Sequence, residues 1–323
     1  MLALLAAIGL QSWALPAARP CTAAEVAEMT APASDTPYRL TCRATLASGQ
    51  SVTRRILIEG AEASGSGIDC RGGTLGVPGQ ATSTRAPTIA IWSRRIEGTA
   101  AAWSRPTDVT IRNCQIHGNI RIWGMGAGGS MSDLLASSRS AGHTAAAQAA
   151  APSHITLAGV AVVGTGSIPL YVGPGVTGTT VLRGRFGGRS DSTAIYLDAE
   201  SRNARIEGVV FDVTTDREQI AIDGSAGNII TGNRFALGGR GGIFLYRNCG
   251  EDGVIRHQTP SGNRITDNVF AGASRFRPRT VVVGAREGNR RYCGDDSGYP
   301  FGSSADDGDG AKGNTVARNS IVR

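Results

Sequence analysis

The stretch that decides the fold is IYLDAESRNARIEGVVFDVTTDREQIAIDGSAGNIITGNRFALGGRGGIFLYRNC, residues 195–249. A short strand-like segment starts at Ile195 and returns at Ile220 and Ile243, and an equivalent segment starts earlier, at Leu170. The steps between the four segments are 25, 25 and 23 residues. Each segment has apolar side chains at its first and third positions, as a strand with one buried face requires.

A second strand-like element follows each of these segments at a matching offset. These elements end at Phe211, Phe235, Phe270 and Ile321, and each has an isoleucine or valine five residues before its end. Glycine or asparagine often falls between, and both accept left-handed backbone angles, so we expect a sharp bend there. Three short strands and three turns per repeat describe a coil whose rungs must stack to bury their apolar faces.

Composition agrees with a protein built from strands. Glycine is abundant with 45 residues, aromatic residues make up 5% and charged residues 18% of the chain. Small and β-branched residues carry the apolar fraction, which favours short strands and tight turns over helix packing. The sequence therefore predicts an all-β solenoid with rungs of about 25 residues.

The rhythm GI-x-L … N-x-I-x-x-N-x-F resembles the right-handed parallel β-helix of the pectate-lyase-like superfamily, over roughly residues 40–323. A leucine-rich-repeat solenoid has a similar period, but its Leu-x-x-Leu-x-Leu pattern is not found. The resemblance implies the fold and leaves the activity open, because the superfamily includes lyases, hydrolases, epimerases and non-catalytic surface proteins. It transfers no catalytic residue, since Asp-Pro-His, Gly-His-Gly and an arginine-centred pectate lyase motif are not recognised here.

Segments outside the repeat divide the chain. We expect the β-helix to span 41–323, after an N-terminal cap or linker over 19–40. An alanine-rich segment at 130–152 breaks the rhythm and is expected to form a helical or loop-like lid. Two long loops, at 248–262 and 288–312, follow first-position strands of neighbouring rungs.

The N-terminus and the cysteines point to export. Residues 1–18 combine an apolar stretch with small residues and proline, as the later parts of a signal peptide do. No later segment approaches the ~20 apolar residues of a membrane span. Six cysteines without a Cys-x-x-Cys pair favour disulfides, and the two long loops place Cys249 opposite Cys293. The pairing of the other four cysteines stays open, and we expect a secreted or periplasmic protein.

Side chains that point away from the coil form two predicted columns. If Ile195 and Leu197 point inward, Tyr196 and Asp198 point outward, because side chains alternate along a strand. The same register on neighbouring rungs predicts an outward aromatic column. Its members are Tyr171, Tyr196, Ala221 and Phe244, and the column beside it contains Gly173, Asp198, Asp223 and Tyr246. Exposed aromatic faces at these positions would suit sugar rings.

Asp198 and Asp223 are expected to be neighbours on an exposed face, because adjacent strands lie ~4.8 Å apart. Two carboxylates this close need a cation, an arginine or a shared proton. Three interpretations stay open: a general acid and base for sugar hydrolysis, a calcium site that binds a uronate, or a structural pair hydrogen-bonded to turn amides.

The long loop after Ile243 adds polar side chains at the wall of an expected cleft. For elimination on a uronate polymer, Tyr246 or His257 could act as base or acid, and Arg247, Arg256 or Arg286 could neutralise the carboxylate. For hydrolysis, Asp198 could pair with Asp223 or with Glu251. Glu251, Arg256 and Arg286 are also expected to contact substrate, together with the aromatic column.

Charge agrees with an acidic partner. The net charge is +7, and Lys312 is the single lysine, so arginine carries nearly all the positive charge. Arginine matches carboxylate oxygens with two parallel donors, although dispersed arginines are also typical of a GC-rich genome. The sequence favours a secreted polysaccharide lyase on an acidic, uronate-containing polysaccharide. A glycoside hydrolase and a non-catalytic carbohydrate-binding or envelope-associated protein are the alternatives. No cofactor beyond possible calcium and no nucleic acid is expected, and the oligomeric state is not fixed.

Overall fold

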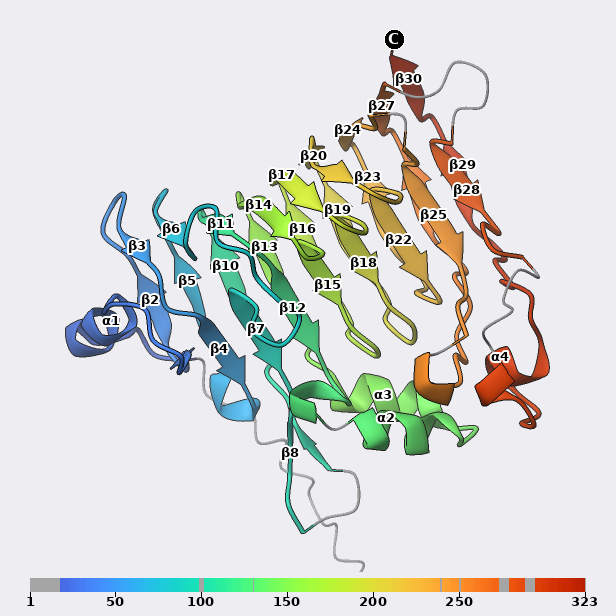
Figure 1. Cartoon of the computed structure of the whole chain (residues 1–323), viewed down its shortest axis with the longest axis horizontal. Coiled ribbons are helices and arrows are strands. Elements are labelled where there is room, and N and C mark those ends of the chain that lie inside the picture. The colour runs from blue at the N-terminus through green and yellow to red at the C-terminus, as the bar shows by residue number, and fades with distance from the viewer. Residues whose placement is uncertain are drawn as a thin grey trace, which may run out of the picture.

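The computed structural model describes residues 18–98, 102–129, 131–238, 240–249, 251–272, 279–287 and 294–322, with the side chain of Glu251 left aside. Three long parallel sheets run side by side along the chain, and each coil contributes one strand to each sheet (Figure 1). The chain is a right-handed parallel β-helix. The predicted signal peptide falls outside the described residues, apart from Ala18.

The first sheet carries the segments that set the repeat in the sequence. Its strands, in spatial order, are β1 (Tyr38–Arg39), β4 (Ile56–Glu59), β7 (Ile89–Trp92), β12 (Ile120–Trp123), β15 (Leu170–Val172), β18 (Ile195–Leu197), β22 (Ile220–Asp223), β25 (Ile243–Tyr246) and β28 (Val281–Val283).

The second sheet follows after the first bend of each coil. Its strands are β2 (Arg43–Thr45), β5 (Gly67–Asp69), β10 (Thr110–Arg112), β13 (Thr156–Ala158), β16 (Thr180–Leu182), β19 (Arg205–Glu207), β23 (Ile229–Thr231), β26 (Arg264–Thr266) and β29 (Thr315–Ala317).

The third sheet completes each coil. Its strands are β3 (Ser51–Val52), β6 (Thr74–Leu75), β11 (Gln115–His117), β14 (Ala161–Gly166), β17 (Arg185–Ser190), β20 (Val210–Phe211), β24 (Arg234–Ala236), β27 (Val269–Ala271) and β30 (Ser320–Val322), with β21 (Thr214–Thr215) beside β17. Strands β8 (Arg94–Arg95) and β9 (Trp103–Ser104) form a separate antiparallel pair.

Stacked identical side chains hold neighbouring coils in register. Phe186, Phe211, Phe235 and Phe270 form one stack inside the coil, with ring centroids 5.3, 4.5 and 4.9 Å apart. At a buried bend, the Asn233 backbone N–H and side-chain Nδ2 both donate to Asn268 Oδ1, at 3.0 and 2.9 Å. The asparagine that recurs in the repeat therefore satisfies backbone groups that a sharp bend leaves unpaired.

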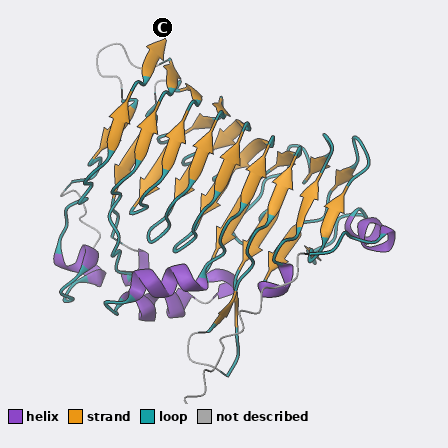
Figure 2. Cartoon of the chain, turned by 180° about the vertical axis from the view of Figure 1, so that it is seen from behind, coloured by secondary structure: helices purple, strands orange, loops and turns teal. Residues whose placement is uncertain are grey.

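Helices occur mainly outside the repeat. Helix α1 (Ala23–Met29) starts with a capping box between Thr22 and Glu25, and its Met29 is fully buried in the core at the N-terminal end. The other helices are α2 (Met131–Ser138), α3 (His143–Ala150) and α4 (Gly302–Ala305), with short 3-10 turns η1 (Ala61–Ala63), η2 (Ala127–Gly129), η3 (Glu251–Gly253) and η4 (Gly294–Asp296). Helices α2 and α3 lie beside the ends of the first sheet's strands (Figures 1 and 2). The inserted segment is thus helical.

Disulfides link neighbouring coils near the N-terminal end. Cys21 bonds to Cys42 and Cys70 bonds to Cys114, which resolves the pairing that the sequence left open. Cys249 is also disulfide-bonded, and its predicted partner, Cys293, lies outside the described residues. Disulfides fit an extracellular or periplasmic protein. None of the helices in the described ranges is long and apolar enough to cross a membrane.

Candidate functional site

The outward columns have the register that the repeat predicts. Tyr171 pairs with Tyr196, Tyr196 with Ala221, and Ala221 with Phe244. Asp223 pairs with Tyr246 in the neighbouring column. The columns also extend one rung further than predicted, because Arg121 of β12 pairs with Tyr171.

The prediction that these side chains lie on an exposed face is wrong. Asp198 is 5% exposed, Asp223 0%, Tyr246 1% and Phe244 7%. Polar partners from the 248–262 loop and the inserted helices cover this face of the first sheet, as the contacts below show. A repeat period reports which way a side chain points, but it does not report what a later segment places over it.

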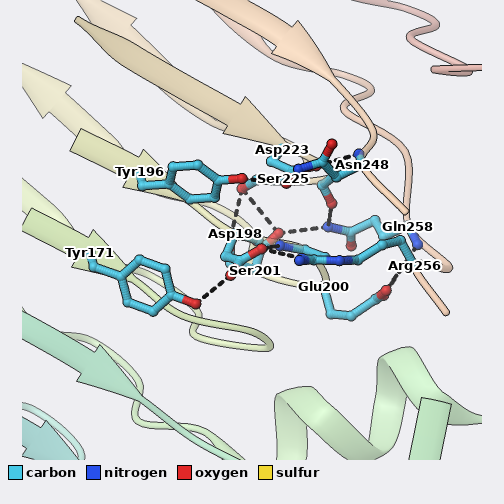
Figure 3. Close-up of polar contacts among 12 residues, drawn as sticks. Tyr171, Tyr196, Asp198, Glu200, Ser201, Asp223, Ser225, Asn248, Arg256 and Gln258 are labelled. Atoms are coloured by element: carbon cyan, nitrogen blue, oxygen red, sulfur yellow. Dashed lines mark hydrogen bonds and ion pairs between the residues drawn. The ribbon is translucent and has the colours of Figure 1, made fainter. Parts of the chain in front are cut away.

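Asp198 accepts hydrogen bonds on both carboxylate oxygens (Figure 3). Its Oδ1 is ion-paired with Arg256 and accepts from the Ala199 N–H at 2.8 Å, and its Oδ2 accepts from the Tyr171 hydroxyl. Burial and the negative charge of Asp198 raise the pKa of Tyr171 well above its usual value. Tyr171 is therefore a neutral phenol that is hydrogen-bonded to a carboxylate.

Asp223 repeats this arrangement one rung further along. Its Oδ2 accepts from the Tyr196 hydroxyl at 2.5 Å and its Oδ1 accepts from the Asn248 N–H at 2.6 Å. Burial raises the pKa of Asp223, the positive charge of Arg256 opposes that rise, and the charge of Asp198 adds to it. Arg256, which sequence analysis assigned to substrate binding, thus supplies the positive charge next to the two carboxylates.

Glu200, which sequence analysis did not single out, ties the covering segments together. Its carboxylate accepts from the His257 N–H at 2.7 Å and from the Gln258 N–H at 3.2 Å, and Thr144 of α3 donates its hydroxyl to the same group. The side chain is 1% exposed. One buried carboxylate therefore joins the first sheet, the 256–258 loop and the inserted helices.

His257 lies where the 256–258 loop contacts the inserted helices. Its Nε2 is 2.7 Å from the Ser138 carbonyl oxygen, and its ring centroid is 5.2 Å from that of His143. Burial lowers the pKa of His143 to about 3, and the charges of His257 and Arg256 add smaller effects in the same direction. Both histidines therefore lie where the loop contacts the inserted helices.

Tyr246 and Arg247, two predicted catalytic residues, are buried and bonded to other protein groups. The Tyr246 hydroxyl accepts from Arg217 at 2.6 Å and donates to Glu218 at 3.1 Å. Arg247 donates to the carbonyl oxygens of Asp306 and Gly308 at 2.6 and 2.8 Å. Neither residue lines the cleft described below.

The remaining predicted contact residues are dispersed. Arg286 stacks on Tyr246, with its guanidinium carbon 4.3 Å from the ring centroid, and Arg279 covers Phe244 at 4.4 Å. The side chain of Glu251 lies outside the described part of the structure. Of the predicted set, Tyr171, Tyr196, Asp198 and Arg256 are the ones that line a common cavity.

That cavity, the main cleft, has a volume of about 470 Å³ between the first sheet, the inserted helices and the 252–256 segment. Its wall includes Arg121, Trp123 and Arg217 in addition to the predicted residues. Trp123 and Tyr171 meet edge to face, with centroids 5.8 Å apart, and Tyr171 stacks on Tyr196 at 5.9 Å. One wall of the cleft is thus a row of aromatic rings.

Arg121 is the most informative residue in this wall. It is 6% exposed, and its guanidinium carbon is 4.1 Å from the Tyr171 ring centroid and 5.3 Å from that of Trp123. Among the described residues no carboxylate is ion-paired with it, and its enclosed Nε has no hydrogen-bond acceptor. Desolvation lowers its pKa, and the negative charge of Asp198 acts in the opposite direction. The sequence carried a usable signal, since Ile120-Arg121-Ile122-Trp123 has the strand pattern of the repeat.

Comparisons with known proteins add no assignment to the fold described above. No family model and no curated protein matches the chain. An alginate lyase from Paenibacillus sp. str. FPU-7 has a TM-score of 0.44 at 11% identity, over 90% of this chain and 92% of that one. The surface protein and adhesin PfbA of Streptococcus pneumoniae has a TM-score of 0.40 at 9% identity, over 86% and 89%. A GH136 lacto-N-biosidase from Eubacterium ramulus has a TM-score of 0.23 at 10% identity, over 89% and 63%.

Proposed function

We propose that the main cleft binds a uronate-containing polysaccharide and cleaves it by β-elimination. Arg121 carries this proposal, because it is a buried guanidinium in a cavity wall without a carboxylate partner among the described residues. A buried charge that lacks a partner is costly, so its retention in a cavity wall favours a ligand that brings the opposite charge. A uronate carboxylate has the charge and the planar shape that a guanidinium fork matches.

The neighbouring rings suit the remainder of a sugar unit. Trp123, Tyr171 and Tyr196 present adjoining aromatic groups next to Arg121. Aromatic faces pack against the C–H groups of a sugar ring, and hydroxyl groups at the ring edge find polar partners. The cleft therefore combines one charge-specific contact with an aromatic wall.

Elimination needs the carboxylate neutralised, a proton removed from the carbon beside it, and a proton for the leaving oxygen. Arg121 would supply the first of these. Tyr171 does not act as a tyrosinate, because its pKa is raised. Its hydroxyl donates to Asp198, so the phenol oxygen can accept the substrate proton while its own proton passes to Asp198.

The proton then returns by the same route. As the C4–O bond breaks and the C4–C5 double bond forms, Tyr171 donates a proton to the leaving oxygen and regains one from Asp198. The enzyme ends in its starting protonation state. Asp198 and Tyr171 form the transfer pair, and Tyr196 with Asp223 supports Tyr171 by ring stacking.

Hydrolysis by the two aspartates has weaker support. Both oxygens of Asp198 and both oxygens of Asp223 already accept hydrogen bonds from protein groups, and Asp223 is fully buried. A hydrolytic pair needs one carboxyl group against the glycosidic oxygen and the other against water or the sugar.

Turnover of polyuronates tests the proposal. We expect the ultraviolet absorbance of an unsaturated product to rise on incubation. The rise should occur without added calcium and in the presence of a chelator, because Arg256 already supplies the positive charge beside the two aspartates. Tyr171→Phe should lose turnover and keep binding, whereas Tyr38→Phe, in β1, should behave as wild type. Reducing ends without unsaturation would indicate hydrolysis, and binding without any product would indicate a carbohydrate-binding protein.

A further inference from the structure

A second cavity lies beside the N-terminal coils, and we call it the N-terminal pocket. It has a volume of about 370 Å³ and is bounded by Asp35, by residues 53–55 before β4, and by residues of the 76–88 segment between β6 and β7. Nothing in the proposed reaction at the main cleft uses these residues.

Two arginines give the N-terminal pocket a positive charge. Arg54 donates to the carbonyl oxygens of Glu28 and Thr36 at 3.1 and 3.3 Å, and Arg55 donates to the carbonyl oxygen of Asp35. Within the described ranges neither guanidinium is ion-paired with a carboxylate, and the enclosed Nε of Arg54 has no acceptor. Asp35 is the one acidic residue of the wall, so two positive charges face one negative charge.

The rest of the wall is rich in hydroxyl and amide groups. Thr53, Gln80, Thr82, Ser83 and Thr88 contribute side chains that both donate and accept hydrogen bonds. Such a wall suits a ligand with many hydroxyl groups and one negative charge.

The N-terminal pocket is close to the main cleft, beside the ends at which β4 and β7 begin. Ser83 lines the pocket, and the next residue, Thr84, lines the main cleft. Between the rung of Arg55 and the rung of Tyr171 lie three strand steps, from β4 through β7 and β12 to β15. At ~4.8 Å for each step the separation along the coil axis is about 14 Å, a distance that a few sugar units can bridge.

We propose that the N-terminal pocket is a distal subsite that binds a second uronate unit of the same polysaccharide, with Arg55 as its charge contact. This inference rests on the function proposed for the main cleft. It assigns the substrate a direction along the coil axis and makes affinity depend on chain length.

We choose Arg55→Gln as the test variant. Arg54 is less suitable, because it donates hydrogen bonds to the carbonyl oxygens of two N-terminal residues and its replacement could disturb the N-terminal cap. Arg43→Gln is the matched control, since Arg43 is an exposed arginine of the second sheet outside both cavities. The measurement is calorimetric binding of size-defined oligouronates, from dimer to octamer, to the full chain of wild type and both variants.

We expect wild-type affinity to rise with length once the oligomer spans both cavities, and we expect Arg55→Gln to bind the longest oligomers about tenfold more weakly. The shortest oligomers should bind all three proteins equally. Equal affinities of wild type and Arg55→Gln at every length, or an equal loss at every length, would overturn the distal subsite while leaving the main cleft intact. Failure of wild type to bind oligouronates of any length would overturn the proposed function itself.

Discussion

Replacing Arg121 with methionine should stabilise the protein and weaken uronate binding at the same time. Burying an unpaired guanidinium costs several kcal/mol, and methionine fills a similar volume without that cost. The two ring contacts of Arg121 offset part of it, by about 1–2 kcal/mol each in a desolvated site. We therefore expect the free energy of unfolding to rise by about 1–2 kcal/mol. Loss of a charge-assisted contact worth about 1.5–3 kcal/mol should weaken oligouronate binding by about 10- to 100-fold.

Arg256→Met is the matched control for Arg121→Met. Arg256 is buried to a similar degree but is ion-paired with Asp198, so its removal leaves a buried carboxylate without its cation. This change should lower the free energy of unfolding by about 3–5 kcal/mol. Urea unfolding followed by far-ultraviolet circular dichroism measures both values. A loss of stability in Arg121→Met as large as that in Arg256→Met, with oligouronate affinity unchanged, would refute the assignment of Arg121 as a ligand-binding charge.

Three further outcomes follow from the buried contacts. Glu200→Gln should lower the free energy of unfolding by about 2–4 kcal/mol, because the charged acceptor of two N–H groups and a hydroxyl is lost. Hydrogen exchange should increase first in residues 256–258 and in α3. Unchanged exchange in these segments would contradict the role of Glu200. Asn268→Ala removes four side-chain hydrogen bonds, three of them buried, and should lower the unfolding free energy by about 3 kcal/mol. An unchanged unfolding free energy would contradict the role of Asn268 in joining neighbouring coils. The pKa of His143 is lowered from 6.5 to about 3, so its neutral form stabilises the fold above pH 6.5, and that stability is lost at about 1.4 kcal/mol per pH unit as the pH falls toward 3. In denaturant titrations between pH 6.5 and 3, the free energy of unfolding of His143→Gln should fall less steeply with pH than that of the wild type. An equal pH dependence in the two proteins would contradict a lowered pKa of His143.

The coil could be predicted from the sequence because its signals are local and repeated. Apolar residues at Ile195, Ile220 and Ile243 fix which side chains point inward, and recurring asparagines mark the bends. The register of Tyr171 with Tyr196 and of Asp223 with Tyr246 follows from this spacing alone.

The site was harder to predict because it depends on segments outside the repeat. Arg121 is one rung from Tyr171 in space but 50 residues earlier in the sequence, since the inserted helices separate β12 from β15. The burial of Asp198 depends on Arg256 from a loop 58 residues later. The repeat in the sequence carries no information on such contacts. The direction of each side chain could therefore be predicted, but the segments that bury it could not.

The most direct test of the central claim is a comparison of two forms of one polymer. Binding of a polyuronate and of its carboxyl-reduced derivative to the wild-type chain isolates the contribution of the carboxylate, because the sugar rings and linkages are otherwise the same. We predict that the polyuronate binds and that the reduced polymer binds about 10- to 100-fold more weakly, a difference that Arg121→Met should abolish. Equal affinity of the wild-type chain for both polymers would contradict a cleft built around Arg121 for a carboxylate.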